Sequence, residues 1–115
     1  MKKIEAIIRP EKLEDVKSAL EARGILTMTV TQVSGRGRQK GIALQWRAGE
    51  YRVEFLPKIK LEIVLSDDEC KTAVDVICKS ARTGKVGDGV IFVLPVDSAM
   101  RVRTTDISET LVKTK

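Results

Sequence analysis

Two glycine clusters interleaved with arginine and lysine form the pattern in this 115-residue sequence that is best suited to ligand chemistry. Six of the eight glycines belong to these clusters: Gly35, Gly37, Gly41, Gly84, Gly87 and Gly89. Glycine lets successive backbone N–H groups turn toward a bound anion and approach it closely. Neither cluster has the Gly-Lys-Ser/Thr ending of a Walker A loop or the spacing of a dinucleotide site. Each cluster is therefore either a phosphate site or a set of ordinary turns.

Two arginines near the end of the chain add a third basic element. Arg101 and Arg103 stand two positions apart within Met100–Thr104, so both side chains would point the same way in an extended segment. Guanidinium groups match the geometry of phosphate oxygens. The alternative for this segment is a solvated tail.

The amino-acid composition excludes the catalytic mechanisms that depend on histidine. The chain has no histidine and no asparagine, so Ser-His and Cys-His nucleophile pairs and histidine zinc ligands are excluded. Asp67, Asp68 and Glu69 are consecutive, and the start of a helix explains them better than a catalytic carboxylate pair does. The formal net charge of +5 favours an anionic partner, such as nucleic acid, an acidic membrane surface or a phosphorylated small molecule.

Hydropathy and cysteine spacing indicate the cellular setting. The longest uncharged run, Gly24 to Gly35, has 12 residues, fewer than the ~18 of a membrane span. Cys70 and Cys78 are eight positions apart on an expected helix. That spacing separates them by about 12 Å along the axis, too far for a disulfide. We therefore expect a reduced, cytoplasmic protein.

The first part of the chain is expected to form a strand, a helix and a second strand, which would position the first glycine cluster. Residues 3–9 alternate apolar and charged side chains, which indicates a strand. Pro10 suits the first turn of a helix, apolar residues follow at helical spacing from Leu13 to Leu20, and Gly24 suits a left-handed helix end. Residues 26–31 alternate aliphatic and threonine side chains, which predicts a second strand.

The second half repeats this order. Residues 58–65 alternate again, and Ser66 with Glu69 has the S-x-x-E form of a helix capping box. Apolar residues from Cys70 to Ala81 mark one face of a helix, and the run Val90–Val96 suits a strand buried on both sides. The order β-α-β-β-α-β predicts an α+β, ferredoxin-like fold, with an antiparallel sheet and both helices on one face. We expect a single domain over residues 1–115.

Apolar residues on the other face of this sheet predict a homo-oligomer. The alternation places Ile7, Val33, Val64, Ile91 and Val93 opposite the core, where they form an apolar patch. Scattered surface aliphatics are the alternative. The two glycine clusters need not meet within one chain, but a symmetric oligomer could bring one subunit's first cluster against its neighbour's second.

Three segments lie outside this plan. Residues 36–54 far exceed the ~2–5 residues of a hairpin connection, and long loops of this kind are usually functional or disordered. Tyr51 lies in this loop, where it is either accessible to modification or an anchor packed on its own domain. Residues 82–89 hold the second glycine cluster, and residues 97–115 form a C-terminal segment.

Four stretches resemble the PII signal-transduction proteins of nitrogen metabolism: Met1–Pro10, Gly37–Gly41, Glu50–Lys58 and Thr83–Gly89. The likeness covers nearly the whole chain, up to about Thr105. It implies a homotrimer of ferredoxin-like subunits with three nucleotide sites between neighbours, where ATP and ADP compete and 2-oxoglutarate binds with Mg-ATP. It also implies that residues 36–54 are a regulatory loop and residues 82–89 a nucleotide loop.

The resemblance assigns ligand roles position by position. The residues that would bind ATP or ADP are Thr29, Gly37, Arg38, Glu62, Val64, Gly87, Asp88, Gly89, Val90, Arg101 and Arg103. Gln39 would bind Mg together with the ATP phosphates, and 2-oxoglutarate would be held by Gln39, Gly41, Lys58 and Gly87. Lys58 would place its ammonium opposite the distal carboxylate of 2-oxoglutarate. Tyr51 matches a tyrosine that is nucleotidylated in many bacterial members.

Two positions depart from the family pattern. Many relatives carry lysine at position 90, where it reaches ATP phosphates, whereas this chain has Val90. The change implies weaker triphosphate binding or a different preference between ATP and ADP. Position 49 is Gly49, so the serine that is phosphorylated in cyanobacterial relatives is missing.

The expected function is a non-enzymatic sensor of ATP/ADP and 2-oxoglutarate that regulates nitrogen-assimilation proteins through residues 36–54. Expected targets are an ammonium transporter or a nitrogen-assimilation enzyme, with membrane contact only through a transporter and no binding to nucleic acid. One alternative is an RNA-binding ferredoxin-like module, which would need aromatic side chains on the central strands. A second is a small phosphate-handling hydrolase, for which a general base is hard to nominate.

Overall fold

A computed structural model of the protein describes residues 1–37, 42–46 and 49–105, with the backbone alone described for residues 42–46 and 49–53. The helices and strands are β1 (Lys2–Ile8), the 3-10 helix η1 (Pro10–Lys12), α1 (Leu13–Glu21), β2 (Thr29–Gly35), β3 (Ile42–Trp46), β4 (Gly49–Val53), β5 (Leu56–Leu65), α2 (Asp67–Ala81) and β6 (Gly89–Pro95). These elements follow the β-α-β-β-α-β order expected from the sequence, with one additional pair of strands between β2 and β5.

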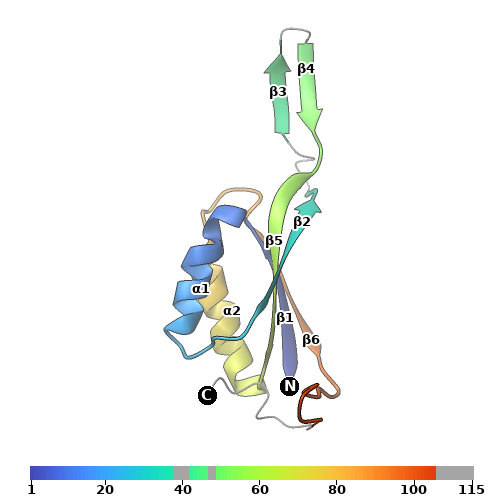
Figure 1. The fold of residues 1–115 in the computed structure, drawn as a ribbon. Helices are drawn as coiled ribbons and strands as arrows, with labels where there is room; N and C mark the ends of the chain where they lie inside the picture. Colours follow the sequence, from blue (N-terminus) through green and yellow to red (C-terminus); the bar gives the residue numbers. More distant parts are fainter. Residues whose placement is uncertain (38–41, 47–48, 106–115) are drawn as a thin grey trace.

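The main sheet has four strands in the order β2-β5-β1-β6, and every neighbouring pair is antiparallel. Both helices cover the same face of this sheet, which leaves the other face without a covering layer (Figure 1). We call that uncovered side the open face. The architecture confirms the α+β, ferredoxin-like fold predicted from the sequence.

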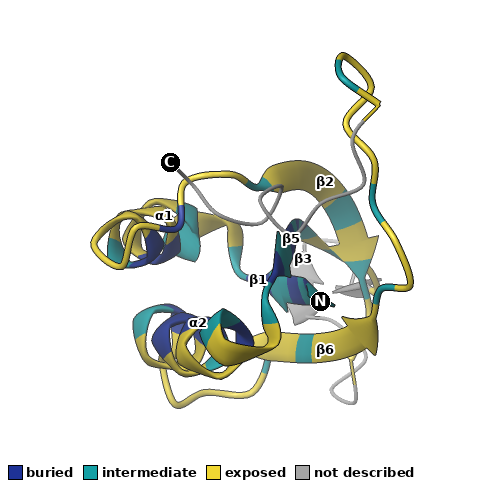
Figure 2. Ribbon diagram, turned by 90° about the horizontal axis from the view of Figure 1, so that it is seen from below, coloured by how far each residue is buried: buried dark blue, intermediate teal, exposed yellow. Residues whose placement is uncertain are grey.

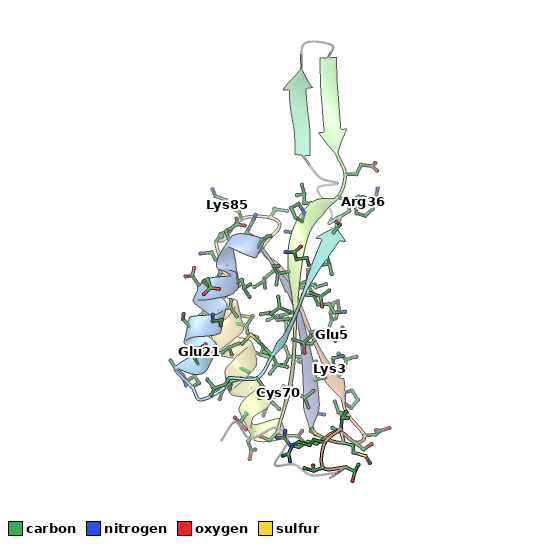
Figure 3. All side chains as sticks on the ribbon, viewed as in Figure 1. Lys3, Glu5, Glu21, Arg36, Cys70 and Lys85 are labelled. Carbon is green, nitrogen blue, oxygen red and sulfur yellow. The ribbon has the colours of Figure 1, made fainter. Side chains whose placement is uncertain are left out.

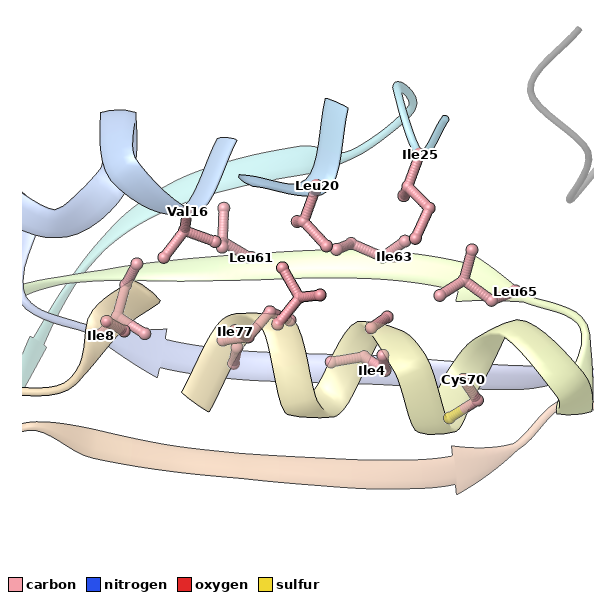
Figure 4. Packing of buried hydrophobic residues seen from close by; sticks show 14 of the residues in the cluster. Ile4, Ile8, Val16, Leu20, Ile25, Leu61, Ile63, Leu65, Cys70 and Ile77 are labelled. Carbon is pink, nitrogen blue, oxygen red and sulfur yellow. The ribbon is translucent and has the colours of Figure 1, made fainter. Parts of the chain in front are cut away.

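The core lies between the helices and the sheet. On β1 and β5 every second residue is buried, because alternate side chains of a strand point to the same face. Figure 2 shows that the buried sides of α1 and α2 turn toward the sheet. The largest fully buried side chains are Ile4, Ile8, Leu20, Ile25, Leu61, Ile63, Leu65, Ile77 and Val16 (Figure 4). The alternation of residues 3–9 and 58–65 therefore predicted the core side of both central strands correctly.

The helix ends follow the chemistry expected from the sequence. Gly24, in the turn after α1, has a φ of +79°, a conformation that glycine adopts without steric cost. Ser66 caps α2: its hydroxyl accepts a hydrogen bond from the Glu69 N–H at 3.3 Å and donates one to the Glu69 carboxylate at 3.3 Å. This capping box fixes where β5 ends and α2 begins.

The expectation for the last strand was wrong in two respects. β6 is an edge strand, and Val90, Phe92, Val93 and Leu94 are all exposed in the single chain, so β6 is not buried on both sides. Its pairing with β1 sets Val93 opposite Ile4 and Ile91 opposite Ala6, on the helix side. Ile91 and Val93 therefore do not belong to the open face. A uniformly apolar run carries no alternation, so only strand pairing could decide which side chains face the helices.

The apolar patch on the open face exists with a different membership. Ile7, Val33 and Val64 lie on this face as expected, because they pair with Val90, Lys58 and Lys3. The apolar residues of the open face are Ile7, Val33, Leu56, Val64, Val90, Phe92 and Leu94. Three of these come from β6, which the sequence pattern alone had assigned to the wrong side.

Residues 36–54 contain a second sheet rather than an irregular loop. β3 and β4 pair as an antiparallel two-stranded ribbon, with Ile42 opposite Val53 and Trp46 opposite Gly49. The ribbon extends from the end of the main sheet at which β2 ends and β5 begins (Figure 1). The second strand of the main fold is also shifted, since β2 covers Thr29–Gly35 rather than residues 26–31.

Candidate functional site

A pocket of about 360 Å³ opens on the open face where the ribbon joins the main sheet. Its lining consists of Ile7, Gly35, Arg36, Gly37, Leu56, Lys58, Val86, Gly87, Gly89 and Val90. The pocket thus brings both glycine clusters together within one chain, a juxtaposition for which the sequence had suggested an oligomer. Figure 3 shows Arg36, just after β2, and Lys85, in the loop before β6, both toward the end of the main sheet from which the ribbon extends.

Lys58 provides the ammonium group in this pocket. It lies on β5 opposite Val33, and its Nζ donates a hydrogen bond of 2.6 Å to the carbonyl oxygen of Gly87. Partial burial lowers the pKa of Lys58, and the nearby Arg9 guanidinium lowers it further. An ammonium that has lost part of its hydration gains more from an anionic partner than a fully solvated one does.

Asp88 closes the loop of residues 82–89 on itself. One carboxylate oxygen accepts hydrogen bonds from the N–H groups of Thr83 and Gly84, each at 2.9 Å. The other accepts from the Thr83 hydroxyl and from Arg9 Nε at 3.1 Å. The Thr83 hydroxyl, with these other donors, holds the pKa of Asp88 well below its usual range. Four donors occupy the acceptor positions of this carboxylate, so its side chain shapes the loop.

Arg9 is a residue of this site that sequence reasoning missed. Arg9 follows β1. Besides its bond to Asp88, its Nη2 donates a hydrogen bond of 2.8 Å to the carbonyl oxygen of Val86. The two partners lie 79 and 77 positions away in the sequence. No local pattern marks an arginine at the end of a strand for such contacts, because they arise only when β1 and β6 pair.

Gly89 is required by the pairing of β1 with β6. Its φ is +119°, and a Cβ placed there would lie 1.8 Å from the carbonyl oxygen of Ile7. Only glycine allows the two backbones to approach this closely at that conformation. Gly89 therefore fixes the end of the loop beside the pocket.

A second group of expected ligand residues lies farther along the same face. Thr29 pairs with Glu62 across β2 and β5, and Val64 pairs with Lys3 across β5 and β1. The Lys3 ammonium contacts the Glu62 carboxylate at 2.5 Å, and this hydrogen bond lowers the pKa of Glu62. Glu62 is four residues beyond Lys58 on β5, about 13 Å along an extended strand, and it does not line the pocket. This group is therefore separate from the pocket within one chain.

The segment that follows β6 and contains the two C-terminal arginines, drawn in red, lies at the opposite end of the sheet from the ribbon (Figure 1). Their segment is not extended, because residues 102–104 form a turn. The Thr105 N–H closes this turn with a hydrogen bond of 2.8 Å to the Arg101 carbonyl oxygen. The expected common direction of Arg101 and Arg103 therefore has no basis, since that argument needed a strand-like backbone. Both arginines are exposed.

The base of the ribbon carries one further contact. The Arg36 guanidinium lies 5.7 Å from the centre of the Phe55 ring and 3.8 Å from the Glu54 carboxylate. It thereby joins the residue that follows β2 to the two residues that precede β5. Exposed contacts of this kind each contribute about 1 kcal/mol or less.

The expected site residues divide into four groups. Gly37, Lys58, Gly87, Gly89 and Val90 line the pocket, with Asp88 beside them in the same loop. Thr29, Glu62, Val64, Arg101 and Arg103 lie elsewhere in the chain. Arg38, Gln39 and Gly41 lie outside the described residues. Only the backbone of Tyr51 is described, on β4 opposite Leu44.

Two further searches concern only the described part of the chain. Within it, no three acidic or cysteine side chains are grouped so that they could bind a metal ion. None of its helices combines the length and the apolar character needed to cross a membrane.

Comparison with known proteins assigns the chain to a family. The family model described as Nitrogen regulatory protein P-II matches residues 1–106. Nitrogen regulatory protein P-II 2 of Methanothermobacter thermautotrophicus is 58% identical over 104 residues, which cover 90% of each chain. Nitrogen regulatory protein P-II of Cereibacter sphaeroides is 52% identical over 112 residues, 97% of this chain and 100% of the relative. Nitrogen regulatory protein P-II 1 of Escherichia coli K12 is 57% identical over 104 residues, 90% of this chain and 93% of the relative. The chain therefore belongs to the P-II family of nitrogen regulatory proteins.

Proposed function

We propose that the protein is a non-enzymatic sensor that binds ATP or ADP and, together with Mg-ATP, 2-oxoglutarate. It would report these ligands to nitrogen-assimilation proteins through residues 36–54. The observation that carries this proposal is the position of Lys58, whose ammonium lies between the ribbon base and the loop of residues 82–89.

The pocket lining suits an anionic ligand. Four glycines bring backbone close to the space, and Lys58 and Arg36 supply positive charge. A carboxylate that met the Lys58 ammonium would gain about 1.5–3 kcal/mol from a charge-assisted hydrogen bond. The same chemistry fits nucleotide phosphates at the glycine-rich backbone, and Gln39 would bind Mg together with those phosphates.

The place of the pocket connects ligand binding to signalling. Gly35, Arg36 and Gly37 line it, and they lie at and just after the end of β2, on the ribbon side of the main sheet. A ligand shifts the ribbon between conformations only by the difference in its affinity for them. A ligand that contacts the base of the ribbon can bind one ribbon conformation more tightly than another. Targets such as an ammonium transporter or a nitrogen-assimilation enzyme would then bind one ribbon conformation.

We place the complete nucleotide site between subunits of a homotrimer. The open face exposes apolar residues on β6 that a neighbouring subunit would cover. Thr29, Glu62 and Val64, with the C-terminal arginines, lie away from the pocket of their own chain. A neighbour would therefore supply them to that pocket. In this assignment Tyr51 stays a candidate for modification, and the cytoplasm is the expected location.

The RNA-binding alternative has little support from the strands. The central strands β1 and β5 carry no aromatic residue, and Phe92 lies on the edge strand β6. A module that stacks bases on the middle of its sheet needs aromatic residues there.

Calorimetry on a Lys58→Ala variant tests the proposal. We expect 2-oxoglutarate affinity in the presence of Mg-ATP to fall at least tenfold, because the distal carboxylate loses its ammonium partner. Lys79→Ala is the matched control, since Lys79 is an exposed helix lysine that contacts only the nearby Asp75 among the described ion pairs. If Lys58→Ala binds 2-oxoglutarate as tightly as the wild type, the assigned role of Lys58 is wrong.

A further inference from the structure

The geometry points to Arg9 as a positioning residue for the nucleotide site, a role that rests on the proposed function. Arg9 contacts the loop of residues 82–89 through two donors, one to the Asp88 carboxylate and one to the Val86 carbonyl. It is absent from the pocket lining and acts through the loop. Its task is to hold the loop in the conformation that presents N–H groups to a phosphate.

The loop needs such a tie because its backbone is unusually permissive. Gly84, Gly87 and Gly89 all have positive φ, at +88°, +101° and +119°. Glycines populate many backbone conformations in a loop, so a ligand that must order them binds more weakly. The bonds among Asp88, Thr83 and Gly84 close the loop internally, but they do not attach it to the sheet.

Two cations from the sheet make that attachment. Arg9 Nη2, at the end of β1, donates to the carbonyl of Val86, and Lys58 Nζ, on β5, donates to the next carbonyl, that of Gly87. In a trans peptide the C=O and the following N–H point in opposite directions. Fixing these two carbonyls therefore fixes the directions of the Gly87 and Asp88 N–H groups, which point away from the two cations. Adjacent N–H groups oriented in this way suit an anion.

The contact specifically uses the shape of a guanidinium. Nε and Nη2 of one planar group reach two acceptors on different residues, a carboxylate oxygen and a carbonyl oxygen. An ammonium keeps the charge but lacks this rigid fork. Lysine at position 9 should therefore restore the charge without restoring the full orientation of the loop.

The test is ADP binding measured by calorimetry on the full chain, for wild type, Arg9→Gln, Arg9→Lys and Asp88→Asn. We expect Arg9→Gln and Asp88→Asn each to weaken ADP binding about tenfold, and Arg9→Lys to give an intermediate loss. The double variant, Arg9→Gln with Asp88→Asn, should lose less ADP affinity than the product of the two single losses, because both changes break the same Arg9–Asp88 contact. Lys79→Gln, which removes a charge from exposed α2, should bind as the wild type does.

The outcomes separate this inference from the function on which it rests. If the wild type binds no ADP, the proposed function fails and the Arg9 role fails with it. Equal ADP affinity in wild type and folded Arg9→Gln overturns only the Arg9 role. If Arg9→Gln does not fold, Arg9→Lys and Asp88→Asn decide, and wild-type affinity in both overturns it. A purely structural role would lower the melting temperature of folded variants while leaving their ADP affinity unchanged below that temperature.

Discussion

Lys58 on the central strand β5 donates a 2.6 Å hydrogen bond to the carbonyl oxygen of Gly87, in the loop that precedes the edge strand β6. One side chain thereby links the strand that follows the ribbon to the glycine loop on the other side of the pocket. An ammonium has three donor hydrogens, so Lys58 can keep this bond while it contacts a ligand carboxylate. A ligand that contacts Lys58 can therefore affect both the loop of residues 82–89 and the base of the ribbon.

Substitution at position 90 should change nucleotide preference. Val90 lines the pocket beside Gly89 and is 45% exposed. Val90→Lys would add an ammonium at the edge of the pocket, and we expect ATP affinity to rise about tenfold through a charge-assisted contact. ADP affinity should rise less. Competitive calorimetry with the two nucleotides measures the ratio, and an unchanged or reduced ATP affinity would show that position 90 does not reach the triphosphate in this chain.

Adding one methyl group at Gly89 should destabilise the fold. Its Cβ would overlap the Ile7 carbonyl oxygen at a φ of +119°, so β1 and β6 must separate. We expect Gly89→Ala to lower the unfolding free energy by about 3 kcal/mol or more. Gly24→Ala is the matched control: its φ is also positive, at +79°, but nothing lies within 4 Å of the added atom. It should cost only about 1 kcal/mol. Urea denaturation compares the two, and equal losses would argue against a close approach at Gly89.

Acid should destabilise the loop of residues 82–89, whereas neutral pH should not. The pKa of Asp88 is lowered in the folded chain from its ordinary value of 3.8. The carboxylate therefore stabilises the folded state above about pH 4, and that contribution is lost as the pH falls below it. Melting temperatures should thus decline below about pH 4. Asp88→Asn should be less stable than the wild type at pH 7 and should show a shallower acid decline. An identical decline in both proteins would remove Asp88 from the explanation.

A charge on the open face should disrupt assembly. Phe92 is 49% exposed and pairs with Glu5 across β6 and β1, on the side that no helix covers. If a homotrimer buries this face, Phe92→Asp places an unpaired carboxylate in its interior and should shift sedimentation toward the 12.7 kDa monomer. Val93→Asp, on the helix side of the same strand, should remain a trimer. A wild-type monomer, or a trimeric Phe92→Asp, would contradict the assembly.

The parts of the fold that the sequence predicted well depend on local signals. The helix start at Ser66 and the helix end at Gly24 each follow from side-chain chemistry within a few residues. The core sides of β1 and β5 follow from strict alternation. The side of β6 was predicted wrongly because Val90 to Leu94 are all apolar, and only its pairing with β1 decides the side.

Only the site residues that stand out by their type in the sequence, such as the clustered glycines, could be predicted. The glycines and Lys58 point to the pocket. The sequence predicts a loop where the ribbon lies, since β3 and β4 pair with each other and do not extend the main sheet. Arg9 could not be found from the sequence, since its contacts span 79 and 77 positions. The turn at Arg101 and Arg103 was missed because two arginines on alternate positions look the same in a strand and in a turn.

The most direct test of the sensor is a calorimetric titration of 2-oxoglutarate into the wild-type protein, with and without Mg-ATP. We predict saturable binding only when Mg-ATP is present, since in the proposed site the nucleotide-bound metal and Lys58 would hold the ligand together. No binding in either condition, or equal binding without nucleotide, would contradict the account.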